Sequence, residues 1–198
     1  MPASNARAAR HLSRTWAQYE QLLKRCVAHP IKPPTCTIMK VIVAFYYQDG
    51  RMRFPEVQGS NLQGRRFKLP QDFGGEINVA LIAFQQHQQY DATTWLPFLK
   101  QQQAQHPCLR TYELPTIWPM SRLRRTMLDM SMRLGIADRA TRALTITLYL
   151  DKVAFRQVLD IPHEDTITVL VVNRAGTVLW RAQGAYNEVK GASLAATL

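Results

Sequence analysis

The sequence predicts an α/β protein built as a three-layer sandwich, in which helices cover both faces of a mixed central sheet. Short apolar runs of strand length alternate along the chain with helical segments, an order typical of parallel strands joined by crossover helices. The last third then places two strands on either side of the turn "NRAG", and such a hairpin adds antiparallel strands. A chain of 198 residues is long enough for one full core with an appended arm.

The first 40 residues are expected to form a basic helical arm with a proline-rich linker, followed by one domain at residues 41–198. The arm holds seven lysines and arginines against one acidic residue, so it carries +6 of the formal net charge of +11. Apolar residues at three- and four-residue spacing predict an amphipathic helix over residues 7–28, which ends before the prolines of "HPIKPP". Three interpretations stay open: a helix packed on its own domain, a targeting or membrane-surface segment, and a protein start at Met39.

The first half of the domain is expected to lead from a turn-rich hairpin into a buried strand and a helix. Asp91 is placed to cap that helix, Pro97 lies inside it, and Trp95 and Phe98 are expected in the core. The expected elements are a strand at 41–47, a hairpin within 54–76, a strand at 77–84, a helix at 91–105, a strand at 109–114 and a loop with Pro115 and Pro119.

The second half is expected to hold two further helix-to-strand steps before the closing hairpin. Asp151 is placed to cap a short helix, and the last helix starts near Asn187. The expected elements are a helix at 121–134, a strand at 144–150, the helix after Asp151, strands at 167–173 and 177–181, and the helix from Asn187.

The helix at 121–134 is expected to place its apolar residues inside and its arginines outside. The apolar set is Leu123, Met127, Met130 and Leu134, and the arginine set is Arg122, Arg124, Arg125 and Arg133. Three interpretations of the arginines stay open: a solvated helix face, a docking surface for an acidic protein, and a nucleic-acid surface. Nucleic acid is disfavoured because no recognised binding motif or interleaved aromatic pattern accompanies the cluster.

Two stretches at opposite ends of the domain suggest a family. "FPEVQGSNLQGRRFKLPQDFGGEINVALIAF" resembles the opening of thioredoxin-like and peroxiredoxin-type domains, and "TVLVVNRAGTVLWRAQGAYNEVKGASLAATL" resembles their closing hairpin and helix. The segment from "ITLYLDKVAFRQVLDI" to "VLWRAQGAY" is similar to the mitochondrial ATP synthase assembly factors of this superfamily and their uncharacterised bacterial relatives. Their hairpin closes with a "W-x-G-x-G"-like ending, where this sequence has Trp180, Arg181 and Gly184 but lacks the glycine after the tryptophan. The resemblance covers about residues 54–198 and implies a thioredoxin-like fold.

The catalytic residues of that family are not present at the matching positions. The resemblance places the paired cysteines of an active thioredoxin near Gln89 and Ala92, with Tyr90 and Asp91 between them, and the family's cis-proline near Thr168. Disulfide exchange requires a thiolate, which amide, phenol and carboxylate side chains cannot replace. The peroxiredoxin signature is also missing, because no cysteine accompanies the threonines at 93 and 94.

The remaining chemistry-bearing residues predict neither a metal site nor a cofactor. Cys26, Cys36 and Cys108 have no redox or metal spacing, and the histidines at 29, 87 and 106 have no ligand spacing. The loop "IPHEDT" sets His163 beside two carboxylates, and we expect it to be solvated. Sparse cysteines, no apolar run of ~20 residues and no signal-peptide pattern favour a cytoplasmic protein, or a mitochondrial one in a eukaryotic source.

Two functional hypotheses follow. The first is a redox-inactive thioredoxin-like protein that binds or assembles another protein, with the arginine helix facing an acidic partner and the arm available for membrane-surface contact. The alternative is a thiol oxidoreductase or peroxiredoxin-like enzyme that uses a non-standard cysteine, or a hydrolase-like activity around His163.

Overall fold

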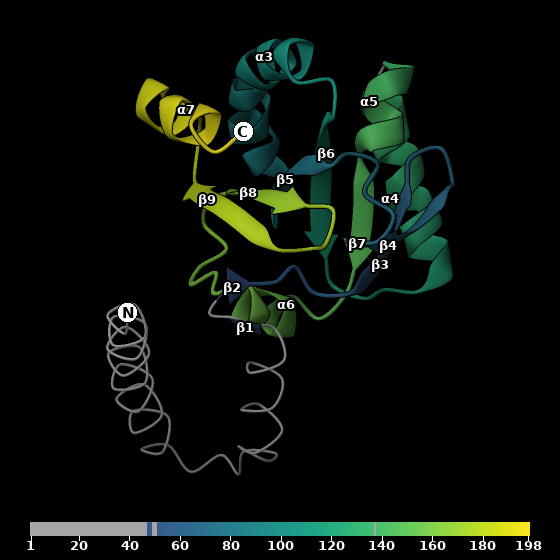
Figure 1. Ribbon diagram of the computed structural model, residues 1–198. Helices are drawn as coiled ribbons and strands as arrows, with labels where there is room; N and C mark the ends of the chain where they lie inside the picture. The colour runs from purple at the N-terminus through teal and green to yellow at the C-terminus, as the bar shows by residue number, and fades with distance from the viewer. Residues whose placement is uncertain (1–46, 49–50, 137) are drawn as a thin grey trace, which may run out of the picture. The chain divides into compact units, whose positions relative to one another are not determined.

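The structure is a computed structural model that describes residues 47–48, 51–136 and 138–198 (Figure 1). The strands are β1 (Tyr47–Gln48), β2 (Arg51–Met52), β3 (Val57–Asn61), β4 (Arg66–Leu69), β5 (Ile77–Ala83), β6 (Leu109–Ile117), β7 (Ile146–Tyr149), β8 (Thr168–Asn173) and β9 (Val178–Gln183). The helices are η1 (Gln86–Gln88, a 3₁₀ turn), α3 (Gln89–Gln105), α4 (Arg122–Gly135), α5 (Arg139–Leu144), α6 (Lys152–Val158) and α7 (Glu188–Ala195). The predicted arm at 1–40, with its three interpretations, and most of the strand predicted at 41–47 lie outside the described residues.

Seven strands form one mixed sheet in the order β4-β3-β7-β6-β5-β8-β9. The central strands β5, β6 and β7 are parallel, whereas β8 and β9 continue the sheet antiparallel and β3 and β4 close the other side as a hairpin. Within it, β5, α3 and β6 form a parallel crossover unit, and β8, β9 and α7 form the closing hairpin and helix. This order is that of the thioredoxin-like fold, so the predicted fold class is confirmed.

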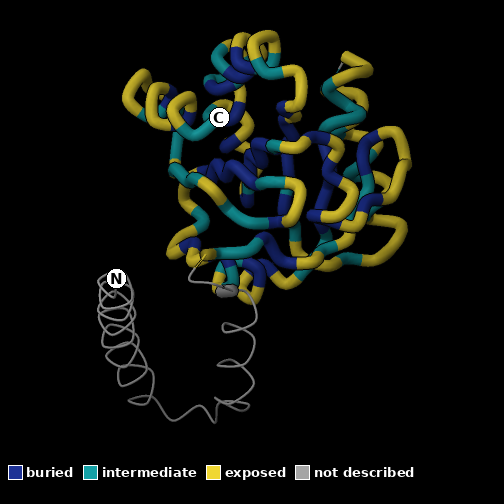
Figure 2. Tube along the Cα trace, viewed as in Figure 1, coloured by how far each residue is buried: buried dark blue, intermediate teal, exposed yellow. Residues whose placement is uncertain are grey.

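Apolar residues cover both faces of the central strands, which explains the apolar run at residues 79–83 of β5. On one face, Trp95 and Leu99 of α3 and Leu194 of α7 pack on Val79 and Val169. A second cluster covers the other face and includes Ala80, Ile82, Leu170, Val172, Phe54, Phe73 and, from α6, Phe155. The tube in Figure 2 is therefore dark blue along the central strands. Helices thus lie on both faces of the sheet, as the sequence predicts.

The local signals at the ends of helices and turns predict the structure well. Asp151 caps α6, because its carboxylate accepts hydrogen bonds from the backbone N–H groups of Val153 and Ala154. Asn187 caps α7 in the same way, through the N–H of Lys190. Gly176 has a φ of +84°, the left-handed conformation that the hairpin turn between β8 and β9 requires.

Three predicted boundaries are wrong. Helix α3 begins at Gln89 rather than Asp91, because the 3₁₀ turn before it brings the chain into helical geometry earlier, and Asp91 lies in the first turn instead of capping it. Strand β6 continues through Pro115 to Ile117, which is tolerated because Pro115 pairs with the last residue of β5, where the ladder ends. The strand predicted from residue 144 starts at Ile146, after the unpredicted helix α5.

Candidate functional site

The position at which the family's thiols are expected lies at the carboxyl end of β5, where the chain turns into α3. Gln89 and Tyr90 are exposed there, Asp91 is half-buried, and Ala92 is buried in the core. Thr168 opens β8, and its buried hydroxyl has no hydrogen-bond partner among the described residues. The fold does bring the loop before β8 to the start of α3, but Glu164 makes that contact, not Thr168.

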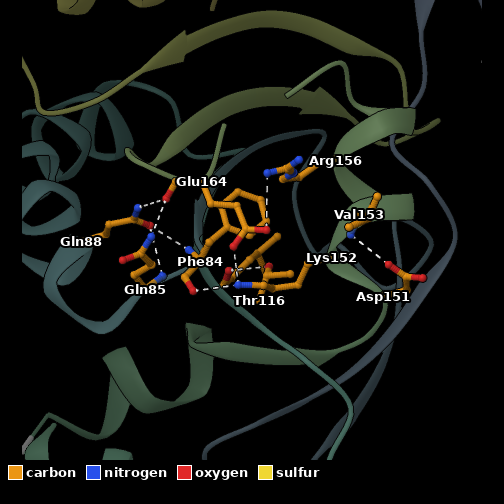
Figure 3. Close-up of polar contacts among 10 residues, drawn as sticks. Phe84, Gln85, Gln88, Thr116, Asp151, Lys152, Val153, Arg156 and Glu164 are labelled. Atoms are coloured by element: carbon orange, nitrogen blue, oxygen red, sulfur yellow. Dashed lines mark hydrogen bonds and ion pairs between the residues drawn. The ribbon is translucent and has the colours of Figure 1, made fainter. Parts of the chain in front are cut away.

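Gln88, just before α3, forms the centre of a buried polar network (Figure 3). Its side-chain Oε1 accepts hydrogen bonds from the backbone N–H groups of Phe84, at 2.8 Å, and Gln85, at 3.3 Å. Its Nε2 donates to the backbone oxygen of Glu164 at 2.5 Å, and Gln85 Nε2 donates to the same oxygen at 3.2 Å. A side-chain amide has both a donor and an acceptor, so it can form hydrogen bonds with the backbone of two loops at once. Gln88 does so with residues 84–85 and with Glu164.

An ion-pair cluster lies next to Gln88 and joins the same loop to α6. Lys152 Nζ lies 2.5 Å from the carboxylate of Glu164, and Arg156 Nη1 lies 3.4 Å from the other oxygen of that carboxylate. Lys152 also donates to the backbone oxygen of Phe84 at 3.3 Å. Only 8% of the Lys152 side chain is exposed, so its ammonium depends on these partners for the solvation that it has lost. Figure 3 shows the three charged side chains converging between the loop and the helix.

Glu113 of β6 is a buried carboxyl group beneath the start of α3. Its Oε2 accepts a hydrogen bond from Gln89 Nε2 at 3.2 Å. Burial raises the pKa of Glu113 above its ordinary value, and the hydrogen bond from Gln89 opposes this increase only in part. Among the described residues the single thiol is that of Cys108, which lies just before β6 and forms no hydrogen bond with Glu113.

The raised pKa of Glu113 predicts a pH dependence of stability. The folded state holds this proton more tightly than the unfolded state, so the contribution to stability is complete below the unfolded pKa and is lost as pH rises through the folded pKa. We expect Glu113→Gln to stabilise the protein at about pH 8 but not at about pH 4, measured by urea unfolding. Exposed Glu56→Gln is the control. An equal effect of Glu113→Gln at both pH values would contradict the assignment.

The described residues hold one cysteine, and it lies at the wrong end of the sheet for thioredoxin chemistry. Cys108 is exposed and precedes β6, whose first residue pairs with Ile77 at the start of β5. The seven residues of β5, at about 3.3 Å each, separate that edge from the start of α3. Within the described part of the chain, no three histidine, cysteine or acidic side chains are grouped to hold a metal ion.

Sequence reasoning missed the network because its members are far apart in the chain. The prediction for "IPHEDT" as a solvated loop holds for the exposed His163 but is wrong for Glu164, which is bound by Lys152 and Arg156. One local signal was available. Lys152 is the first residue of α6, where the helix dipole disfavours a cation, so a lysine there indicates a nearby anion.

Helix α4 is the second unusual feature, because its apolar face points away from the protein. Leu123, Met127, Met130 and Leu134, called here the α4 stripe, are between 58% and 81% exposed. No residue of α4 is fully buried, and the side chains that face the body are Arg125, Leu128, Asp129 and Met132. The prediction that the stripe lies inside is therefore wrong, because the opposite face of the helix, with its own apolar and polar groups, packs on the sheet.

The four arginines predicted to bind a partner differ in their surroundings. Arg125 is engaged with the protein itself, since its Nε donates to the backbone oxygen of Met120 at 2.9 Å and its guanidinium lies 4.7 Å from the centre of the Tyr149 ring. Asp129 accepts a hydrogen bond from the hydroxyl of Tyr149, and burial together with this bond raises the pKa of Tyr149. Arg122, Arg124 and Arg133 are exposed. Only these three of the predicted set can face a partner without breaking a contact.

No helix among the described residues is long and apolar enough to cross a membrane. The sequence matches no protein-family model and no curated protein.

Several solved structures are similar in fold. They include the exposed lipoprotein thioredoxin of Streptococcus pneumoniae, at 10% identity and a TM-score of 0.48 over 73% of this chain and 100% of that one. BsSco, a member of the Sco family of cytochrome c oxidase assembly proteins, is similar at 10% identity and a TM-score of 0.49 over 74% and 94%. A thioredoxin-family thiol:disulfide interchange protein of Chlorobium tepidum is similar at 11% identity and a TM-score of 0.43 over 74% and 93%. At these values the similarities indicate neither a family nor an activity, and the fold assignment rests on the strand order.

Proposed function

We propose that this protein is a redox-inactive thioredoxin-like module that acts by binding another protein. The observation that carries the proposal is the α4 stripe, whose four large apolar side chains are exposed to solvent. The opposite face of α4 already contacts the sheet, through Arg125 and Asp129 at Tyr149. Isolated exposed apolar residues are ordinary, but a row of them along one face of a helix is typical of an interaction surface.

The region around Gln88 supports the absence of thiol chemistry. Its polar atoms are engaged with each other, through Gln88, Lys152 and Glu164, and the groups at the start of α3 are an amide, a phenol and a carboxylate. Such a network can hold two loops and a helix in place, but it contains no nucleophile that could attack a disulfide. The position thus has a structural use in place of a redox use.

The assembly-factor form of the proposal rests on the sequence resemblance of residues 146–186 to the mitochondrial ATP synthase assembly factors. An assembly factor holds a partner without chemically changing it, which suits a fold that has Gln89 and Ala92 where the resemblance places the thiols. Contact of residues 1–40 with a membrane surface stays a prediction from the sequence.

The test compares the full-length tagged protein with a variant in which Cys26, Cys36 and Cys108 are all replaced by serine. We expect both to recover the same partner protein from the source cells, and neither to accelerate the reduction of insulin by dithiothreitol. Recovery of no partner by either protein would overturn the binding proposal. Insulin reduction by the native chain that is lost in the serine variant would establish the alternative, an oxidoreductase with a non-standard cysteine.

A further inference from the structure

The spacing of the α4 stripe defines what kind of surface it is. Its four residues are separated by four, three and four positions, which is the d-a-d-a spacing of a heptad repeat. Positions of this kind form a narrow seam along one side of a helix, whereas a helix that lies on a lipid surface presents a broad apolar face. The side of α4 next to the seam is polar: Thr126 and Ser131 are exposed there together with arginines.

The charges beside the seam are all of one sign. In the heptad frame Arg124 follows a d position and Arg133 precedes an a position, so they occupy e and g, the two positions that form ion pairs with a partner helix. The acidic residue of α4, Asp129, is held by Tyr149 on the side that faces the body. A partner helix therefore meets guanidinium groups on both flanks of the seam.

Charge also decides which kind of helix can bind the α4 stripe. A second copy of this chain would bring the same arginines against Arg124 and Arg133, and like charges at these positions disfavour pairing. Residues 1–40 carry seven basic residues and one acidic residue, so their net charge opposes docking on α4 as well. A partner helix with acidic flanks avoids both conflicts, because its carboxylates attract Arg124 and Arg133.

We propose that α4 forms a short two-helix coiled coil with an acidic amphipathic helix of a partner protein. The partner helix places apolar residues against the α4 stripe and glutamates or aspartates beside Arg124 and Arg133. This inference rests on the proposed function, which it refines by assigning the surface and the chemistry of the partner. The methionines at the centre of the stripe suit such a contact, because their flexible thioethers adapt to the shape of the facing side chains.

A defined peptide tests the chemistry. The probe is a fluorescent synthetic helix of about three heptads with leucine at a and d and glutamate at e and g, whose own charge keeps it monomeric. We expect it to bind the full-length protein in fluorescence anisotropy, and we expect Met127→Ser with Met130→Ser to weaken binding by about tenfold or more. A peptide of the same charge with serine at a and d should not bind. Equal binding of the two peptides, or binding unchanged by the double serine variant, would overturn the proposal.

Charge reversal tests the flanks. Arg124→Glu with Arg133→Glu should weaken binding of the glutamate peptide by about tenfold and create binding to a matched peptide with lysine at e and g. Arg66→Glu with Arg139→Glu makes the same change of net charge on exposed residues outside α4, and we expect it to retain binding. If both charge variants lose binding equally, the attraction is one of net charge and the assigned flanks are wrong.

A photocrosslinker at position 127 of the full chain identifies the occupant in source cells. The expected crosslink joins position 127 to an acidic helical segment of another protein, read by sequencing of the crosslinked peptide. Crosslinks to lipid, to a second copy of the chain or to residues 1–46 would each overturn the inference. A partner recovered equally by wild type and by a variant with serine at all four positions of the α4 stripe would leave the proposed function standing and remove α4 as its surface. Recovery of no partner by either would remove both.

Discussion

Replacing Trp95 with alanine is expected to lower the free energy of unfolding by about 4 kcal/mol, the largest loss of any single change considered. The indole is fully buried at 0% exposure, between α3 and the closing hairpin. Its ring packs edge-to-face on Tyr186 with centroids 5.3 Å apart and on Trp180 at 6.1 Å, so the cavity would open at the junction of three elements. Urea unfolding followed by far-ultraviolet circular dichroism measures the loss.

Two further variants separate the causes of that loss. Trp95→Phe keeps most of the ring but removes the hydrogen bond from Nε1 to the backbone oxygen of Gly184, and we expect a cost of about 1 kcal/mol beyond the change in packing. Trp118→Ala removes an indole that is 48% exposed, and we expect a loss under about 1 kcal/mol. A similar loss for Trp95→Ala and Trp118→Ala would contradict the assigned core.

Replacing Glu164 with alanine is expected to lower the free energy of unfolding by about 3 kcal/mol. The change leaves Lys152 almost buried with one hydrogen-bond acceptor among the described residues, the backbone oxygen of Phe84, and it removes the carboxylate partner of Arg156 as well. A buried ammonium without its anion carries a desolvation cost that no counter-charge offsets, and this cost reduces stability. Denaturant midpoints at neutral pH give the value.

A second substitution shows whether the loss of stability comes from the Lys152 ammonium that has lost its carboxylate partner. Lys152→Met in the Glu164→Ala background removes the ammonium, and we expect it to recover most of the loss. His163→Ala changes the exposed neighbour of Glu164 and should leave stability within about 0.5 kcal/mol of wild type. If Glu164→Ala costs less than about 0.5 kcal/mol, the cluster behaves as a solvated surface pair.

The fold was predictable because its signals are local. The apolar runs of β5 and β8, the caps Asp151 and Asn187, and the glycine of the last turn each act over a few residues, so the sequence displays them directly. The early start of α3 was not predictable from a cap, because the residue at its N-cap position is Gln88, which makes no capping bond. Its side chain is used instead in the buried network.

The contacts of the site were not predictable from the sequence. The sequence resemblance predicts that Gln89 and Ala92 lie where an active thioredoxin has its paired cysteines, but it says nothing of the side chains that surround them. The contacts of Gln88 and Lys152 join residues 76 and 68 positions apart, so they exist only once the sheet has formed. A first-turn lysine in α6 was the single hint of a hidden anion.

The orientation of α4 shows a limit of periodicity. A 3.6-residue pattern locates a stripe on a helix, but it does not say which side of that helix the body covers. Here Leu128 and Met132 supply a second apolar row, and the contacts of Arg125 and Asp129 with Tyr149 favour that row as the inner face. A polar anchor of this kind is recognisable only after the position of Tyr149 in β7 is known.

The pairing of β5 with β8 has a consequence for synthesis of the chain. Asn78 and Val172 lie opposite each other in that pair, 94 residues apart in sequence. A ribosome that has reached residue 160 has therefore released a central strand that is apolar on both faces and still lacks one of its two neighbours. We expect the nascent chain to stay open and protease-sensitive until residues 168–173 emerge, and to occupy a chaperone during that interval.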